Sequence, residues 1–423
     1  MNKAILDLEY KTLHVVMKME LSGVKIDLKK CEQTFDELKK LNELLSHEIN
    51  EYSNGQINLN SPQQLHELLF ETLKLKPEID KVGNSGCYST NKSHLNKLIK
   101  QHQIIQQILD YRKTVSLSNF CKQLKNVNPT TKRLHGQFNQ IGTATGRFSC
   151  SKPNLQNIPN VKLKPNEKNE LRILESRFRE MFIPDVGCQF ICADYSQIEI
   201  RVAAEMSQDE FLIKAYNKDL DIHSLTASEV FEIEYSKVTN EQRSIAKSIN
   251  FGLIYGKTAF GLSASLTEIT GKHHSIESAE NMMSQYFSRF KGVKKCLDDL
   301  VVSSDENGYS ETIFGRRRPI PQLSSNKISV RSAGKRLAMN SPIQGTAADI
   351  IKMAMVACDE EIRSKKLKSK LVLQVHDELL FEVPNDEVQL MEALIKETME
   401  NVVRLSIPLE VGLEKGKNWA IAH

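Results

Sequence analysis

Two short apolar segments that each lead into aspartate, separated by a long helical stretch, constrain this chain more than any other feature. The first is Phe190–Asp194, and the second is Lys370–Val375 with Leu379–Val383 close behind. Apolar, β-branched runs bounded by polar turn formers are typical of buried strands. The intervening Asp209–Leu300 and Val330–Arg363 show helical spacing instead. Strands from both ends must therefore meet in one sheet, with the helical stretch inserted as a lobe.

The N-terminal part has a helical pattern. Residues 8–53 and 94–125 repeat apolar side chains at helical spacing, and Ser61 followed by Pro62 has the form of a helix start. Arg133–Phe138 reads as a strand, and Tyr309–Pro321 as a hairpin. We therefore expect a helical unit followed by a sheet.

Charge is unevenly distributed along the chain. The formal net charge is +4, yet residues 91–170 alone carry +11. A basic segment suits a polyanion such as nucleic acid, although solvated surface is the simpler alternative. The eight cysteines form no CxxC pair. No apolar run reaches the length of a membrane span. These features predict a reduced, intracellular protein that does not enter a membrane.

Aspartates close both apolar segments. A carboxylate at a strand end is rigidly placed and open to solvent, which suits a metal ligand, but Asp194 could equally cap a helix. In the second segment His376 precedes the adjacent acids Asp377 and Glu378. Adjacent acids in an apolar setting are costly unless a cation neutralises them, and a solvated turn is the alternative.

A second pattern combines cations with aromatic side chains. Arg243, Lys247, Phe251 and Tyr255 recur every fourth residue, so they lie along one slowly turning helix face. Cations suit the phosphates of a nucleotide, and aromatic rings suit its sugar and base. The alternative is a surface helix whose Phe and Tyr belong to the core.

A third pattern concentrates amides beside an arginine. Thr143–Ser149 contains Arg147, and Pro153–Pro159 follows with Asn154, Gln156 and Asn157. Planar amides near a guanidinium suit hydrogen bonds to base edges and sugars. A loop rich in turn formers is the alternative.

Together, in this order, these segments resemble the family A DNA polymerases, the family of bacterial DNA polymerase I and of eukaryotic polymerases theta and nu. Asp194–Arg201 resembles the family's motif A, Arg243–Gly256 its motif B and Val375–Glu378 its motif C. Residues 143–159 are similar to its primer-template grip. Further matches are Asp221-Ile222-His223, Phe314–Arg318 and Arg336–Asp349.

The resemblance implies an α+β right-hand polymerase fold, with an antiparallel-sheet palm, helical fingers inserted in the palm and a helical thumb. The expected boundaries are 1–130 for the thumb, 131–205 for the first part of the palm, 206–329 for the fingers and 330–423 for the second part of the palm. It also predicts a polymerase domain without an associated proofreading or 5′ nuclease domain.

The implied activity is that of a DNA-directed DNA polymerase, which extends a primer 3′ end with deoxynucleotides by two-metal-ion transfer. Asp194, Asp377 and the backbone carbonyl of Tyr195 would hold two Mg²⁺ ions, with Mn²⁺ possible. Glu378 would be an accessory acid, and Lys247 would act on the leaving pyrophosphate.

The resemblance also assigns binding roles. Glu199 would be a steric gate against a ribose 2′-hydroxyl. The other nucleotide-binding residues would be Arg243, Lys247, Phe251, Tyr255, His223 and Gln197. The DNA-binding residues would be Arg147, Asn154, Gln156, Arg336, Asn340, Gln344 and His376.

The expected partners are primer-template DNA and deoxynucleotides, bound by a monomer. Whether the role is replication, repair or lesion bypass stays open, as do protein partners. A single-subunit RNA polymerase is one alternative, against which Glu199 argues. A DNA-binding protein that has lost catalysis is the other, against which the intact Asp194, Asp377, Lys247 and Arg243 argue.

Overall fold

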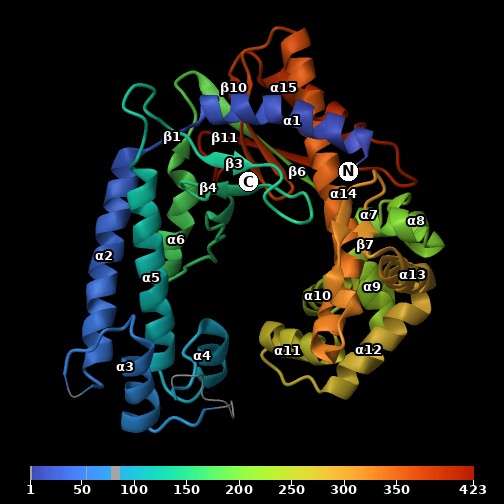
Figure 1. Ribbon diagram of the computed structural model, residues 1–423. Helices are drawn as coiled ribbons and strands as arrows, with labels where there is room; N and C mark the ends of the chain where they lie inside the picture. Colours follow the sequence, from blue (N-terminus) through green and yellow to red (C-terminus); the bar gives the residue numbers. More distant parts are fainter. Residues whose placement is uncertain (1, 54, 78–85) are drawn as a thin grey trace. The chain divides into compact units, whose positions relative to one another are not determined.

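The computed structural model describes residues 2–53, 55–77 and 86–423 (Figure 1). The chain divides into two compact units. Unit 1 comprises Met1–Ser22, Gln137–Ser151 and Val186–Lys415, and unit 2 comprises Gly23–Gly136, Lys152–Asp185 and Gly416–His423. Both units combine helices with antiparallel strands, as the α+β prediction requires.

The central sheet of unit 1 has the strand order β11–β6–β10–β9. Strand β10 (Glu378–Pro384) pairs antiparallel with both β6 (Cys188–Tyr195) and β9 (Lys370–Val375), and β11 spans Val411–Gly416. Consecutive residues of β6 and β10 are fully buried, so both faces of these strands are covered. Two covered faces explain the continuous apolar runs in the sequence. The predicted meeting of the two distant segments in one sheet is confirmed.

The chain between β6 and β9 is mostly helical, as predicted. Its helices are α7 (Ile198–Ser207), α8 (Glu210–Tyr216), α9 (Ile222–Phe231), a 3₁₀ turn (Tyr235–Lys237), α10 (Asn240–Ile254), α11 (Ala259–Thr270), α12 (Ile276–Arg289) and α13 (Lys291–Asn307). The predicted hairpin follows as β7 (Tyr309–Glu311) and β8 (Arg317–Pro319), before a 3₁₀ turn (Pro321–Ser324).

Helix α14 (Ile328–Ser364) returns the chain from this insertion to the sheet. Its 37 residues correspond to a length of roughly 55 Å. It packs on α1 (Lys3–Ser22), α7, α13 and α15 (Val388–Glu400). Figure 1 shows it in orange, running from the inserted helices to the sheet. It therefore connects the two parts of unit 1 that carry the predicted site residues.

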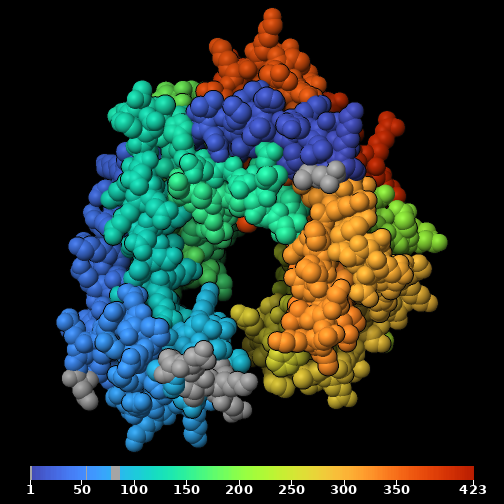
Figure 2. All heavy atoms as spheres, in the orientation of Figure 1, coloured from blue at the N-terminus to red at the C-terminus, as the bar shows by residue number. Residues whose placement is uncertain are grey.

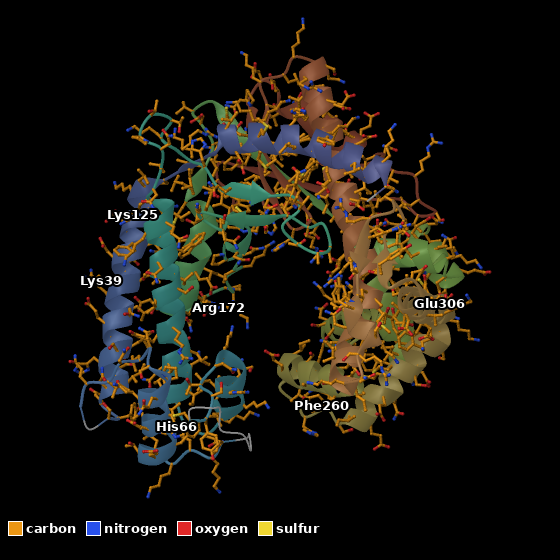
Figure 3. All side chains as sticks on the ribbon, viewed as in Figure 1. Lys39, His66, Lys125, Arg172, Phe260 and Glu306 are labelled. Carbon is orange, nitrogen blue, oxygen red and sulfur yellow. The ribbon has the colours of Figure 1, made fainter. Side chains whose placement is uncertain are left out.

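Unit 2 is built around the long helices α2 (Leu28–Asn50) and α5 (Ile104–Leu124), which lie side by side (Figure 1). Figure 3 shows the side chains of this unit, among them the long basic side chains of Lys39 on α2 and of Arg172 on α6 (Glu170–Glu180). The shorter helices are α3 (Pro62–His66), a π-helix (Glu67–Thr72), α4 (Lys92–Leu98), a 3₁₀ turn (Leu155–Asn157) and α6 (Glu170–Glu180). The predicted cap is confirmed, because the Ser61 side chain accepts from the Gln64 N–H and Pro62 opens α3.

One sequence prediction was wrong in extent. The predicted strand 133–138 is two strands, β2 (Arg133–Leu134) of unit 2 and β3 (Gln137–Asn139) of unit 1, because each pairs with a different partner. β2 pairs with β1, and β3 pairs with β4 (Ser149–Ser151). The helices predicted within residues 8–53 are confirmed as α1 and α2. The strand between them, β1 (Val24–Ile26), was not predicted and lies between β2 and β5 (Phe182–Ile183).

The boundaries of thumb, palm and fingers stay predictions. Helix α1 packs on α14 and β9 within unit 1. Its opposite face carries exposed apolar side chains and is open in the space-filling view (dark blue in Figure 2).

Among the described residues, no helix is both long enough and apolar enough to cross a membrane.

The C-terminal segment of unit 2 depends on one aromatic side chain. Trp419 is completely buried, its ring lies edge-on to Phe182 at 5.3 Å, and the Arg179 guanidinium lies 4.2 Å from it. We expect Trp419→Ala to destabilise unit 2 by about 3–5 kcal/mol, since it removes a large buried side chain and leaves a cavity. Chemical denaturation should measure this loss. Ile421→Ala is the control, because Ile421 is 58% exposed, and an equal loss for both variants would contradict the prediction.

Candidate active site

Antiparallel pairing brings the two predicted acidic segments together. Glu378 lies directly opposite Asp194 in the β6–β10 register, and directly opposed residues present their side chains on the same face. His376 and Asp377 form the turn between β9 and β10, with His376 in the left-handed region at φ +57°. The Tyr195 N–H donates to the Asp377 carbonyl at 3.3 Å. This bond ties the turn with Asp377 to the strand end with Asp194.

The acidic groups have the chemistry of a divalent-cation site. Burial raises the pKa of Asp377, and the neighbouring Glu378 charge acts in the same direction, although His376 and Arg147 oppose it. Glu378 itself is only 4% exposed. A hard cation with oxygen ligands would favour the ionised form of such carboxylates. Asp194, Asp377 and the Tyr195 carbonyl therefore fit the predicted Mg²⁺ ligands.

A cavity of about 230 Å³ adjoins this acidic edge. Six of the predicted site residues line it, and the remaining wall is apolar, from Ile198 on α7 and from Ala347, Ala348 and Ile351 on α14. The six are Arg147, Gln197, Glu199, Phe251, His376 and Asp377. Two of these lining residues are paired, because the Arg147 guanidinium donates to the Glu199 carboxylate. Residues from five separate parts of the sequence thus share one concave surface.

Helix α10 presents the predicted cations and rings on one face. A capping box of Thr239 and Gln242 begins the helix. Arg243 and Lys247 are exposed, whereas Phe251 and Tyr255 are half-buried. Lys247, Phe251 and Tyr255 also line a second cavity of about 340 Å³, so the two rings face cavities instead of a closed core.

The exposed Arg243 side chain is held by a neighbouring carboxylate, that of Asp221. The Arg243 Nε and Nη2 atoms donate to the Asp221 carboxylate at 2.8 and 3.1 Å. Burial disfavours the Asp221 carboxylate, but hydrogen bonds from Arg243 and Ser224 outweigh it and lower the pKa of Asp221 to about 2. Arg243 is therefore oriented by the charged residue that caps the N-terminus of α9.

His223 is held as a neutral imidazole. The Asn250 Oδ1 accepts from Thr226 Oγ1 at 3.0 Å, which leaves its Nδ2 to donate to His223 Nδ1 at 3.1 Å. Burial lowers the pKa of His223 to about 4, and the positive charges of Arg243 and Lys247 contribute. The proton of the neutral ring is then on Nε2, where it can be donated to a ligand.

The predicted DNA-binding residues fall into three groups. Arg147 and His376 line the cavity described above. Arg336, Asn340 and Gln344 recur every fourth residue on α14, and the same stripe continues to Ala348 in the cavity wall. The Asn340 Oδ1 is buried and has no hydrogen-bond partner among the described residues. Asn154 and Gln156 instead lie in unit 2, where the Asn154 side chain accepts from the Gln156 N–H at 3.1 Å and caps a 3₁₀ turn.

Sequence reasoning gave no role to several residues that hold this site. Asn250 and Thr226 orient His223, Asp221 orients Arg243, and Ala347 and Ala348 shape the cavity wall. A signal was present for Asp221, which stands two residues before His223 in a segment that resembles the family. Nothing in the sequence pattern distinguishes Thr226 or the two alanines from ordinary helical residues.

The family model for "DNA polymerase family A" matches residues 28–421. The chain belongs to DNA polymerase family A.

Relatives and a solved structure agree with this membership. The chain is 41% identical to DNA polymerase I of Caldicellulosiruptor bescii over 98% of its length and 47% of the relative. It is also 41% identical to DNA polymerase I of Borreliella burgdorferi, covering 45% of that relative. The chain thus spans about half the length of these curated relatives. A polymerase-domain structure, "POL domain of Pol1 from M. smegmatis complex with DNA primer-template and dNTP", matches with a TM-score of 0.88 and 38% identity, covering 98% of this chain and 70% of that one.

These matches confirm the predicted fold class. The α+β architecture is that of a family A polymerase domain, with the antiparallel sheet bearing motifs A and C and motif B on α10.

The buried neutral His223 makes stability depend on pH. Its pKa is 6.5 in the unfolded chain and about 4 in the folded one, so the unfolded state binds the extra proton between these values. Well above pH 6.5, His223 is neutral in both states and its titration does not affect the free energy of unfolding. Between pH 6.5 and 4, protonation of the unfolded state lowers the free energy of unfolding, by about 2 kcal/mol at pH 5. We expect His223→Gln to reduce the loss of unfolding free energy between pH 7 and pH 5 by this amount. Identical pH dependence in both proteins would show that His223 is not held neutral.

Proposed function

We propose that this chain is the catalytic polymerase domain of a DNA-directed DNA polymerase, which extends the 3′ end of a primer with deoxynucleotides copied from a template. The observation that carries the proposal is the β6–β10 pairing, which sets Asp194 opposite Glu378 and ties Asp377 to the same strand end, beside a cavity lined by motif A and motif B residues. The relatives named DNA polymerase I support it.

The acidic edge would hold the metal ions. Two divalent cations, with Mg²⁺ as the expected species, would supply charge stabilisation to the attacking and leaving oxygens of the nucleotidyl transfer. Asp194, Asp377 and the Tyr195 carbonyl would be their protein ligands, and Glu378 would add negative charge behind them. The bond between the Tyr195 N–H and the Asp377 carbonyl keeps these ligands in register.

The basic side chains of α9 and α10 would bind the triphosphate of the incoming nucleotide. Arg243 and Lys247 are exposed cations on one helix face, which suits charge-assisted hydrogen bonds to phosphate oxygens. His223, as a neutral ring, would donate its Nε2 proton to a phosphate oxygen. Lys247 would neutralise or protonate the pyrophosphate as the bond from its oxygen to the α-phosphorus breaks.

The cavity would hold the sugar and base of the incoming nucleotide. Phe251 would pack against the sugar, Tyr255 would border the base-pair pocket, and Gln197 would help to close it. Glu199 is 8% exposed and accepts from Arg147. A carboxylate held in that position would crowd a ribose 2′-hydroxyl and so would favour deoxynucleotides.

Polar groups around the cavity would contact the primer-template. Arg147 and His376 line the cavity, and Asn340, Gln344 and Arg336 follow along α14. The minor groove offers acceptors at corresponding positions of every base pair, so donors of this kind can test pair geometry without reading sequence. Asn154 and Gln156 are proposed to contact the same DNA.

The metal assignment predicts the behaviour of two variants. Asp194→Ala or Asp377→Ala should reduce primer extension with Mg²⁺ by more than about a hundredfold, since each removes stabilisation of charge that develops in the transition state. Binding of primer-template should stay close to that of the parent, because phosphate contacts dominate affinity. Glu378→Ala should be milder.

Asp386→Ala is the matched control, since Asp386 is an exposed acid in the turn after β10, and it should extend normally. Extension by either Asp194→Ala or Asp377→Ala at more than a few per cent of the parent rate would refute the assignment.

The steric-gate assignment predicts a change in sugar selection. Glu199→Ala should increase ribonucleotide insertion relative to deoxynucleotide insertion in a competition assay on one primer-template, because it opens the space that a 2′-hydroxyl needs. Glu205→Ala, on the same helix but bonded to the Ser406 N–H, should leave the ratio unchanged. A ratio that Glu199→Ala does not move would remove Glu199 from the sugar site.

A further inference from the structure

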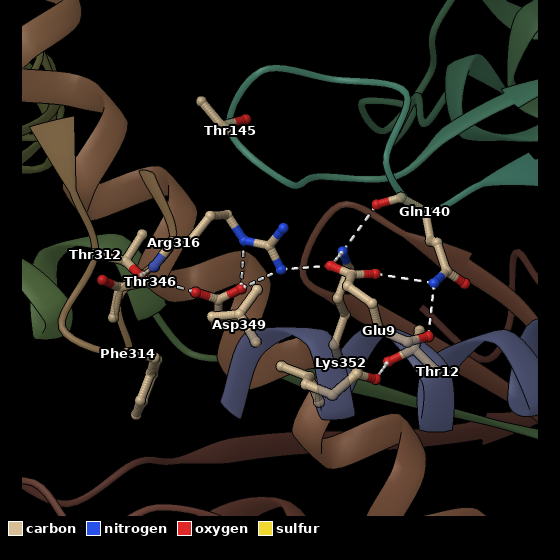
Figure 4. Close-up of polar contacts among 12 residues, drawn as sticks. Glu9, Thr12, Gln140, Thr145, Thr312, Phe314, Arg316, Thr346, Asp349 and Lys352 are labelled. Carbon is tan, nitrogen blue, oxygen red and sulfur yellow. Dashed lines mark hydrogen bonds and ion pairs between the residues drawn. The ribbon is translucent and has the colours of Figure 1, made fainter. Parts of the chain in front are cut away.

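A buried cluster of opposite charges lies in unit 1 outside the cavity (Figure 4). It joins Glu9 of α1, Arg316 of the β7–β8 turn, and Asp349 and Lys352 of α14. The four side chains are between 0% and 9% exposed. Two cations and two carboxylates balance, as buried charges require.

The contacts within this charge cluster are dense. Arg316 Nε donates to Asp349 Oδ1 at 2.7 Å, and its Nη2 atom pairs with Glu9. Lys352 Nζ donates to the same Glu9 oxygen at 2.6 Å. Thr312 Oγ1 donates to the other Asp349 oxygen at 3.0 Å. The Arg316 guanidinium is therefore held from two sides and has little freedom to move.

The charge cluster also binds the loop between β3 and β4 through hydrogen bonds and a cation–π contact. Lys352 Nζ donates to the Gln140 carbonyl at 2.8 Å, and the Gln140 side chain donates to the Glu9 carbonyl and carboxylate at 2.7 and 2.9 Å. At the far end of the loop, the Phe148 ring lies 5.4 Å from Lys352 Nζ. Both ends of the loop thus contact the same side chain, that of Lys352.

Gly146 packs directly against the guanidinium of Arg316. A Cβ atom at this position would lie 2.6 Å from Arg316 Nε and 2.8 Å from its Cδ and Cζ atoms. The residue also has φ +81°, where a side chain is strained. Only glycine therefore fits between the loop and the charge cluster.

Arg147 is the residue between these contacts. It follows Gly146, precedes Phe148 and reaches Glu199 in the cavity. Its backbone carbonyl accepts from Thr143 Oγ1 at 2.8 Å. The direction of its side chain is thus set by a backbone that the charge cluster immobilises on both sides.

We propose that the Glu9–Arg316–Asp349–Lys352 cluster is a positioning device for Arg147, and through Arg147 for the Glu199 carboxylate. The proposal rests on the polymerase function proposed above. None of the four residues lines the cavity, so they act through the loop. The cluster would set how well the site aligns a correct deoxynucleotide, and how strictly it excludes a ribonucleotide.

Gly146→Ala tests this coupling with minimal change. Its Cβ should displace the loop from Arg316 and reduce kcat/KM for the correct deoxynucleotide by about tenfold to a hundredfold, mainly in kcat, because a shift near 1 Å is enough for a loss of this size. The ratio of ribonucleotide to deoxynucleotide insertion should also change. Gly308→Ala is the matched control, since Gly308 has φ +74° but an added Cβ would meet no atom within 4 Å.

A double-variant cycle separates positioning from a general loss of stability. In the Arg147→Ala background, Gly146→Ala should cost little further activity, because the residue that the loop positions is gone. Glu9→Gln, which keeps the shape of the side chain but removes its charge, should show the same dependence on Arg147. An undiminished effect of Gly146→Ala in the Arg147→Ala background, or no effect in the parent, would overturn the proposal.

A crystal structure of Gly146→Ala gives a readout that does not depend on activity. In this structure the hydrogen bond between Arg147 and Glu199 should be broken, while the contacts within the charge cluster persist. An Arg147–Glu199 pair that survives the substitution would refute the positioning role, whatever the kinetics. A parent protein that fails to extend primers would instead refute the polymerase function, so the two failures are distinguishable.

Discussion

The pairing of β6 with β10 is the constraint on which unit 1 depends. Seven consecutive residue pairs, from Glu378 opposite Asp194 to Pro384 opposite Cys188, join segments at opposite ends of a long insertion. Burial on both faces makes this register stable, since a shift by one residue would exchange the faces of every side chain. The same register sets the acids that we propose as metal ligands at one strand end. Fold stability and placement of the acids therefore have one physical cause.

The inserted helices and α14 then bring the remaining groups to that strand end. α7 follows β6 directly and carries Glu199, α10 packs on α7 and α9 and carries Phe251, and α14 closes the cavity wall. No single element contains the site. The cavity exists because helices from the insertion pack back against the helix that returns the chain to the sheet.

Paired partners orient several of the proposed functional side chains of unit 1. Asp221 holds Arg243, Asn250 holds His223, and Glu199 accepts from Arg147. Each pair reduces the number of conformations that a long or ionisable side chain can adopt before a ligand arrives, which is the usual basis of preorganisation. By our proposal, the Glu9–Arg316–Asp349–Lys352 cluster restricts the conformations of a backbone segment, the loop between β3 and β4, in the same way.

The sequence by itself determined the strands around Asp194 and Asp377, the helical insertion, the helix face of Arg243–Tyr255 and the family resemblance. These are readable because burial and helical periodicity leave local patterns. It did not reveal the break between β2 and β3 or the strand β1, since both depend on which distant strand is available to pair. Nor did it reveal the roles of Asn250, Thr226 and the four clustered charges. Only the tertiary structure decided these, because a buried hydrogen bond or ion pair joins residues far apart in sequence, such as Glu9 and Lys352, and leaves no periodic trace.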